Sequence, residues 1–153
     1  MTLQYAHIVA GKPAKIGGEY IHHTRFGEKT ILENAIDEAA NAGFSVVSTV
    51  REACSLQEQY GRRKEVVILE ARTALIESAI FGLLEGVVNR YSPHYFRGTQ
   101  YDQKACTALA DEQPELRELP VLYVGSDIPL LREHDFVTAR EEYTRLGEPD
   151  ILI

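Results

Sequence analysis

The sequence is poor in cysteine and has no long apolar run. Its two cysteines, Cys54 and Cys106, form no Cys-x-x-Cys motif, which excludes a disulfide-stapled scaffold and a zinc finger. No apolar stretch approaches the roughly 20 residues that span a bilayer, and the N-terminus does not resemble a charged leader followed by an apolar segment. We therefore expect reduced thiols, a cytoplasmic location and no membrane partner.

Basic side chains are also in the minority. The 16 Lys and Arg residues are outnumbered by 23 Asp and Glu residues, which gives a formal net charge of -7. A negative net charge repels the phosphates of a nucleic-acid backbone, so no nucleic-acid partner is expected. The short basic run Arg62-Arg63-Lys64 is interpreted as a solvated loop.

The rest of the composition is typical of a folded globular chain. Hydrophobic residues make up 44% and charged residues 25% of the 153 positions. A chain of this length fits one hydrophobic core. Residues 1–153 are therefore expected to form a single domain.

Apolar segments alternate with amphipathic ones along this domain. Short apolar or β-branched runs predict buried strands at 3–10, 44–50, 65–69 and 119–124, and the start of another at 150–153. Helical periodicity predicts helices at 29–42, 55–60, 73–88 and 132–146. This alternation predicts an α/β fold: a doubly wound, mainly parallel, Rossmann-like sheet with helices on both faces.

Two segments interrupt the alternation. Residues 11–28 carry several glycines and no sustained period, so they are predicted to be a loop. Residues 89–119 are rich in Tyr, Arg, Gln and Asp, and an irregular segment of this length inside a compact domain is expected to be a lid or an insertion.

Two strand ends carry residues suited to a nucleotide. Ligands of doubly wound sheets bind outside the carboxyl ends of the strands, where the strand order reverses. After the first strand, residues 10–18 (AGKPAKIGG) combine small residues, whose amides can approach a phosphate, with two lysines that can neutralise it. After the fourth strand, Gly125-Ser126-Asp127 places a carboxylate where a divalent cation could be held. The first strand and the strand ending at Val124 are therefore predicted to be neighbours.

Each of these features also has a structural interpretation. The glycine-rich segment is neither G-x-G-x-x-G nor a P-loop and could be a tight turn. Asp127 could equally cap the helix that follows it. His22 and His23 are adjacent in the predicted loop and have no nearby Cys or Asp, so they are expected to be solvent-exposed rather than metal ligands.

The order of features resembles the nucleotidyltransferase branch of the nucleotide-diphospho-sugar transferase superfamily. That branch includes the molybdenum-cofactor guanylyltransferases and the sugar-phosphate nucleotidyltransferases. The similar segments are IVAGKPAKIGG, RFGEKTILENAIDEAANAG, TALIESAIFGLL and VLYVGSDIPLL. The resemblance covers most of the chain up to about Leu131 and implies the sheet type of that superfamily.

The resemblance also implies an activity. A nucleoside monophosphate would be transferred from a nucleoside triphosphate to a small phosphorylated acceptor, with Mg²⁺ as cofactor and pyrophosphate as product. Asp127 would bind the Mg²⁺. The triphosphate would be held by the glycine-rich segment, through Ala10, Gly11, Gly17 and Gly18, with Lys12 and Lys15 as the catalytic cations.

The glycine-rich segment departs from the family pattern. It has Lys12 where a second glycine is usual, and Lys15 where the family prefers arginine, whose guanidinium can bind phosphate through two donors. Two alternatives therefore stay open: a catalytically inactive nucleotide-binding or regulatory domain of the same fold, and a metal-dependent glycosyltransferase. Association with a second copy or with a partner subunit also stays open.

Overall fold

The computed structural model describes residues 2–10, 15–50, 54–70, 111 and 119–149. The helix predicted at 73–88, the strand predicted at 150–153 and nearly all of the segment at 89–119 lie outside the described residues. Gly11, Lys12 and Cys106 lie outside them as well.

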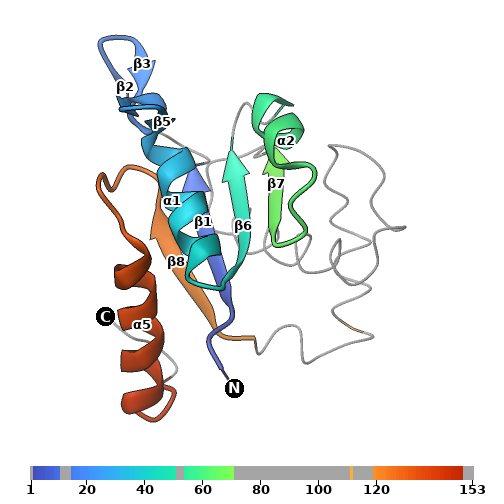
Figure 1. The fold of residues 1–153 in the computed structure, drawn as a ribbon, viewed down its shortest axis with the longest axis vertical. Coiled ribbons are helices and arrows are strands. Elements are labelled where there is room, and N and C mark those ends of the chain that lie inside the picture. Colours follow the sequence, from blue (N-terminus) through green and yellow to red (C-terminus); the bar gives the residue numbers. More distant parts are fainter. Residues whose placement is uncertain (1, 11–14, 51–53, 71–110, 112–118, 150–153) are drawn as a thin grey trace.

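Four parallel strands form the main described sheet, in the order β7–β6–β1–β8 (Figure 1). They are β1 (Tyr5–Ala10), β6 (Ser45–Val50), β7 (Val66–Glu70) and β8 (Val121–Gly125). β1 pairs with β6 along one edge and with β8 along the other. The four predicted strands, the α/β class and the proximity of β1 to β8 are therefore confirmed.

The described α-helices also match predicted ones. They are α1 (Ile31–Asn41), α2 (Cys54–Tyr60) and α5 (Glu133–Arg145). α1 begins after Thr30, whose hydroxyl accepts from the Glu33 backbone N–H at 3.1 Å, while the Glu33 carboxylate accepts from the Thr30 N–H at 2.7 Å. This reciprocal capping box sets the start of the helix two residues later than predicted.

The core lies between the sheet and α1. Alternate residues of β1, namely Ala6, Ile8 and Ala10, pack with Leu32 and Ile36 of α1. This alternation follows from the two-residue period of a strand. α5 packs beside α1 (Figure 1), so the two helices lie together on one face of the sheet.

The predicted loop at 11–28 is wrong for its described part, which contains two small hairpins. β2 (Lys15–Ile16) pairs with β3 (Glu19–Tyr20), and β4 (Arg25–Phe26) pairs with β5 (Lys29–Thr30). A short 3₁₀ turn, η1 (Ile21–His23), joins the hairpins. Gly17 and Gly18 supply the two positive φ angles, +60° and +86°, that a type I′ hairpin turn needs. Strands of two residues are too short to show an apolar–polar alternation. The glycines of the turns were therefore the main indication of these hairpins in the sequence.

Asp37 of α1 is the centre of an ionic network that ties α1 to α2 and to the segment between α2 and β7. Its carboxylate lies 2.8 Å from the Lys29 ammonium and 2.9 Å from the Arg63 guanidinium, and it accepts from the Tyr60 hydroxyl at 3.1 Å. Arg63 also bonds Glu65 at 2.6 Å, so the basic run is not simply solvated as expected. Burial and the Asp37 charge raise the pKa of Tyr60, which keeps its phenol a donor.

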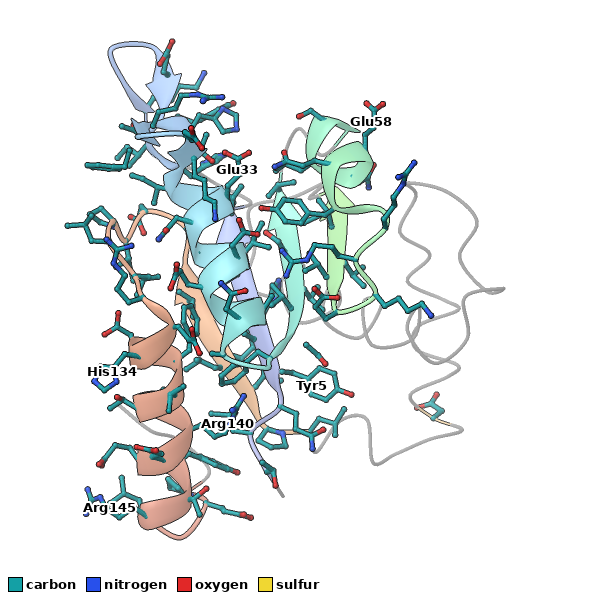
Figure 2. All side chains as sticks on the ribbon, viewed as in Figure 1. Tyr5, Glu33, Glu58, His134, Arg140 and Arg145 are labelled. Carbon is teal, nitrogen blue, oxygen red and sulfur yellow. The ribbon has the colours of Figure 1, made fainter. Side chains whose placement is uncertain are left out.

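Replacing Asp37 with alanine is expected to lower the free energy of unfolding by about 2 kcal/mol. The two cations would lose their shared carboxylate, whose side chain is only 15% exposed. The Tyr60 hydroxyl would lose its nearer acceptor and keep the Glu33 carbonyl at 3.5 Å. Urea unfolding followed by far-UV circular dichroism measures the change. Glu58→Ala is the matched control, because Glu58 is an exposed acid on α2 (Figure 2). A loss no larger than the control's would mean that the network does not stabilise the fold.

Candidate functional site

The carboxyl ends of β1 and β8 lie side by side where the strand order reverses. After β1 the chain passes through α1 to β6 and then to β7 on one side, whereas β8 pairs with the other edge of β1. Val9 is in register with Gly125, and the next N–H along, that of Ser126, donates to the Val9 carbonyl at 3.2 Å. The two predicted strand ends therefore lie next to each other on the carboxyl side of the sheet. Ligands of α/β sheets bind on this side.

The side chain of Asp127 folds back over the end of β8. A Cβ atom added to Gly125 would lie only 2.8 Å from the Asp127 Oδ1, so the carboxylate occupies the space that a side chain at Gly125 would fill. Asp127 is solvent-exposed. A hard divalent cation prefers oxygen ligands of this kind.

The alternative interpretation of Asp127 as a helix cap is wrong. The next described helix, α5, begins at Glu133, six residues further along the chain. The N–H of Arg132 donates to the Asp135 carboxylate at 2.8 Å, and the N–H of Glu133 donates to Glu38 of α1 at 2.6 Å. These acids take the capping role, which leaves the Asp127 carboxylate available at the strand end.

The segment that follows Asp127 is tied to α1. The side-chain amide of Asn34 donates to the Leu131 carbonyl at 2.8 Å. Between these anchors, Ile128 and Leu130 expose 44% and 61% of their surface, and Leu130 has a positive φ of +61°. A leucine in this conformation is strained, and such positions concentrate at functional sites.

The predicted phosphate-binding residues of the glycine-rich segment are divided between β1 and the first hairpin. Ala10 closes β1 and is buried, so only its backbone is suited to contact a ligand. Lys15 opens β2, and its ammonium lies 4.5 Å from the centroid of the Tyr20 ring, a cation–π distance. This contact orients an exposed cation in the segment that follows β1.

Gly17 and Gly18 form the tip of the β2–β3 hairpin. Their positive φ angles explain why glycine is present, without any need for a ligand. A Cβ atom at either position would meet no atom within 4 Å, so open space surrounds the tip. The hairpin extends beyond the N-terminal end of α1 (Figure 1).

The N-terminus of α1 is not an open anion site. Helix N-termini bind phosphate through free amides. Here the Glu33 N–H donates to the Thr30 hydroxyl, and the Glu33 carboxylate accepts from the Thr30 N–H, which places a negative charge at this end of α1 (Figure 2). Burial acts in the opposite direction, yet hydrogen bonds from Thr30 and Gln59 lower the pKa of Glu33, which keeps it charged. A phosphate at this edge of the sheet would therefore depend on the segment between β1 and α1.

The two adjacent histidines differ in environment. His23 is exposed as expected, but His22 is only 2% exposed, so its predicted exposure is wrong. The His22 ring stacks on Tyr20 at 5.5 Å between centroids and contacts the His23 ring at 4.2 Å. Burial, and then the charge of His23, lower the pKa of His22 to about 4. His22 is thus neutral and packed within the hairpin region.

His7 is a second buried histidine. It lies in the middle of β1 and is fully buried, on the sheet face opposite the Ala6 and Ile8 side chains. Its ring lies 5.6 Å from that of Tyr123, and burial lowers the pKa of His7 to about 4. The burial of His7 was not predicted, because a single histidine in an apolar run does not indicate whether its side chain is buried or exposed.

In the described part of the chain, no group of three or more His, Cys, Asp or Glu side chains gathers as a set of metal ligands. Mg²⁺ does not need such a set, since it is commonly held by one or two carboxylates together with substrate phosphates and water. A single carboxylate such as that of Asp127 is compatible with this pattern.

None of the described helices has the length and apolarity needed to cross a membrane. Comparison of the chain with protein-family models, curated proteins and solved structures found no match.

Proposed function

We propose that the chain binds a nucleoside triphosphate with Mg²⁺ at the carboxyl ends of β1 and β8 and transfers the nucleoside monophosphate to a small phosphorylated acceptor. The observation that carries the proposal is the solvent-exposed Asp127 carboxylate, folded over a strand end that lies beside the end of β1. Its position at the reversal of strand order matches the general rule for ligand sites in such sheets.

The proposal includes a doubly wound sheet with helices on both faces. The strand order β7–β6–β1–β8 corresponds to the order 3-2-1-4 with which Rossmann-like sheets begin. α1 and α5 cover one face, and the burial of Tyr5, His7 and Val47, which point to the other face, is what a second covering layer would produce.

In the proposed reaction, the residues at the two strand ends position charges rather than form covalent bonds. An oxygen of the acceptor phosphate attacks the α-phosphorus, and the bond to the β-phosphate oxygen breaks, so pyrophosphate leaves with the electron pair. Mg²⁺, when bound, would neutralise the triphosphate and the leaving group. Asp127 would hold this ion, and Lys15 would supply a further positive charge from β2.

A nucleotide-binding domain without catalytic activity is the second candidate. Two observations favour it: Lys15 already contacts the Tyr20 ring, and the N-terminus of α1 carries Glu33 rather than a free phosphate site. The two candidates differ in turnover. Release of pyrophosphate from a nucleoside triphosphate, in the presence of phosphorylated sugars or cofactor precursors, supports the enzyme, whereas tight binding without release supports the binding domain.

Asp127→Asn is expected to weaken the Mg²⁺-dependent binding of a nucleoside triphosphate by about tenfold or more. The amide keeps the size of the side chain but removes its charge, and the melting temperature should not change because Asp127 caps no described helix. Calorimetric titration of each of the four common triphosphates, with and without Mg²⁺, measures the effect.

Glu141→Gln is the matched control for this substitution, because Glu141 is an exposed acid on α5 and lies outside the site. It should leave the affinity unchanged. Equal Mg²⁺-dependent affinity of Asp127→Asn and the unmodified protein would remove Asp127 from the site, and failure of the unmodified protein to bind any triphosphate would refute the proposed function.

A further inference from the structure

The structure leaves no room for a side chain at Gly125. Five described glycines have a positive φ, namely Gly17, Gly18, Gly27, Gly43 and Gly147, and Gly125 is not among them. Its backbone conformation therefore does not require glycine. A Cβ atom at this position, however, would lie 2.8 Å from the Asp127 Oδ1, closer than real Cβ contacts occur. Any side chain at position 125 requires the carboxylate or the backbone to move.

The backbone around Gly125 is held more firmly than the carboxylate. Gly125 pairs with Val9, and the buried Ser126 donates its N–H to the Val9 carbonyl at 3.2 Å. Further along, the Asn34 side chain holds the Leu131 carbonyl at 2.8 Å. The Asp127 carboxylate, by contrast, is the exposed end of a short side chain. It is therefore the group that would move.

We infer that Gly125 is a positioning residue for the cation site, and that its missing side chain allows the Asp127 carboxylate to fold back over the end of β8. This inference rests on the proposed function. Metal sites tolerate only small errors in ligand position, and displacing one ligand by about 1 Å is enough to weaken a site. Gly125 would thus act through Asp127 and contact neither the ion nor the nucleotide.

Gly125→Ala tests the inference, with Mn²⁺ as a spectroscopically visible substitute for Mg²⁺. Electron paramagnetic resonance titration of Mn²⁺, in the presence of whichever triphosphate the unmodified protein binds, is expected to show an affinity about tenfold lower. The expected change in melting temperature is small, because the displaced group is exposed. In an Asp127→Asn background, Gly125→Ala should cause no further loss of Mn²⁺ affinity, since a residue that acts only through the carboxylate has nothing left to position.

Unchanged Mn²⁺ affinity in Gly125→Ala would overturn the inference, and so would a further loss in the Asp127→Asn background. A protein that binds neither Mn²⁺ nor nucleotide in its unmodified form would instead refute the proposed function, and the inference with it.

A stability measurement checks the steric premise without any ligand. Gly125→Ala is expected to lower the melting temperature slightly in the unmodified protein and not at all in an Asp127→Ala background, because the clashing carboxylate is then absent. The same change in both backgrounds, including no change in either, would contradict the steric premise.

Discussion

Phe136→Ala is expected to lower the free energy of unfolding by about 4 kcal/mol. Phe136 of α5 is only 2% exposed, and its ring packs edge-on against Phe44 with 6.0 Å between the ring centroids. Truncation removes this aromatic pair and leaves a cavity between α5 and the rest of the core. Urea unfolding followed by far-UV circular dichroism measures the loss.

Leu146→Ala provides the control for Phe136→Ala, because Leu146 follows α5 directly but exposes 48% of its surface. Its expected effect is below about 0.5 kcal/mol. Similar losses for the two substitutions would contradict the packing of α5 on the core. Arg140 of α5, labelled in Figure 2, supports the same packing. It donates to the Leu3 carbonyl at 3.1 Å, and its guanidinium lies 4.2 Å from the centroid of the Phe44 ring.

Acidification is expected to destabilise the fold between about pH 6.5 and pH 4. His7 and His22 have pKa values of about 4 in the folded protein, because burial disfavours their charged forms, against 6.5 for a free histidine. The unfolded chain therefore binds more protons in this interval. The stability from the neutral histidines is fully present above pH 6.5 and is lost as the pH falls towards 4, and His7, which is fully buried, is expected to account for about 3 kcal/mol of this loss. Urea unfolding at several pH values measures the slope.

His22→Phe separates the contributions of the two histidines. Phenylalanine keeps an aromatic ring against Tyr20 but cannot take up a proton, so the part of the slope between pH 6.5 and 4 that comes from His22 should disappear. His134→Gln is the control, since His134 is exposed on α5 (Figure 2), and it should leave the slope unchanged. An unchanged slope in His22→Phe would mean that His22 does not titrate as described.

The sheet could be predicted because its strands are short runs of apolar and β-branched residues. The segments around Ile8, Val47 and Val67 lack the regular apolar–polar alternation of a strand with one exposed face, and the glycine at position 43 ends the helix before β6. The meeting of β1 and β8 followed from a topological rule of doubly wound sheets rather than from any single residue.

Other features depend on three-dimensional contacts that leave no local pattern. The burial of His22 arises from its stacking on Tyr20, and the role of Arg63 arises from Asp37, which lies 26 residues away in the chain. The Asp127 side chain lies over Gly125 because of its side-chain conformation, and a sequence pattern does not specify that conformation. The position of Asp127 was therefore predictable, whereas the space that Gly125 provides for it was not.

The most direct test of the proposed site is paramagnetic broadening of backbone amide resonances by Mn²⁺ bound with a nucleoside triphosphate. Broadening is expected to be strongest at Ala10, Ser126 and Asp127, which lie at the two adjacent strand ends, and to require an Mn²⁺ concentration about tenfold higher in Asp127→Asn. Broadening centred instead on the acidic helix α5, or an Mn²⁺ effect that does not change in Asp127→Asn, would contradict a nucleotide–metal site at the ends of β1 and β8.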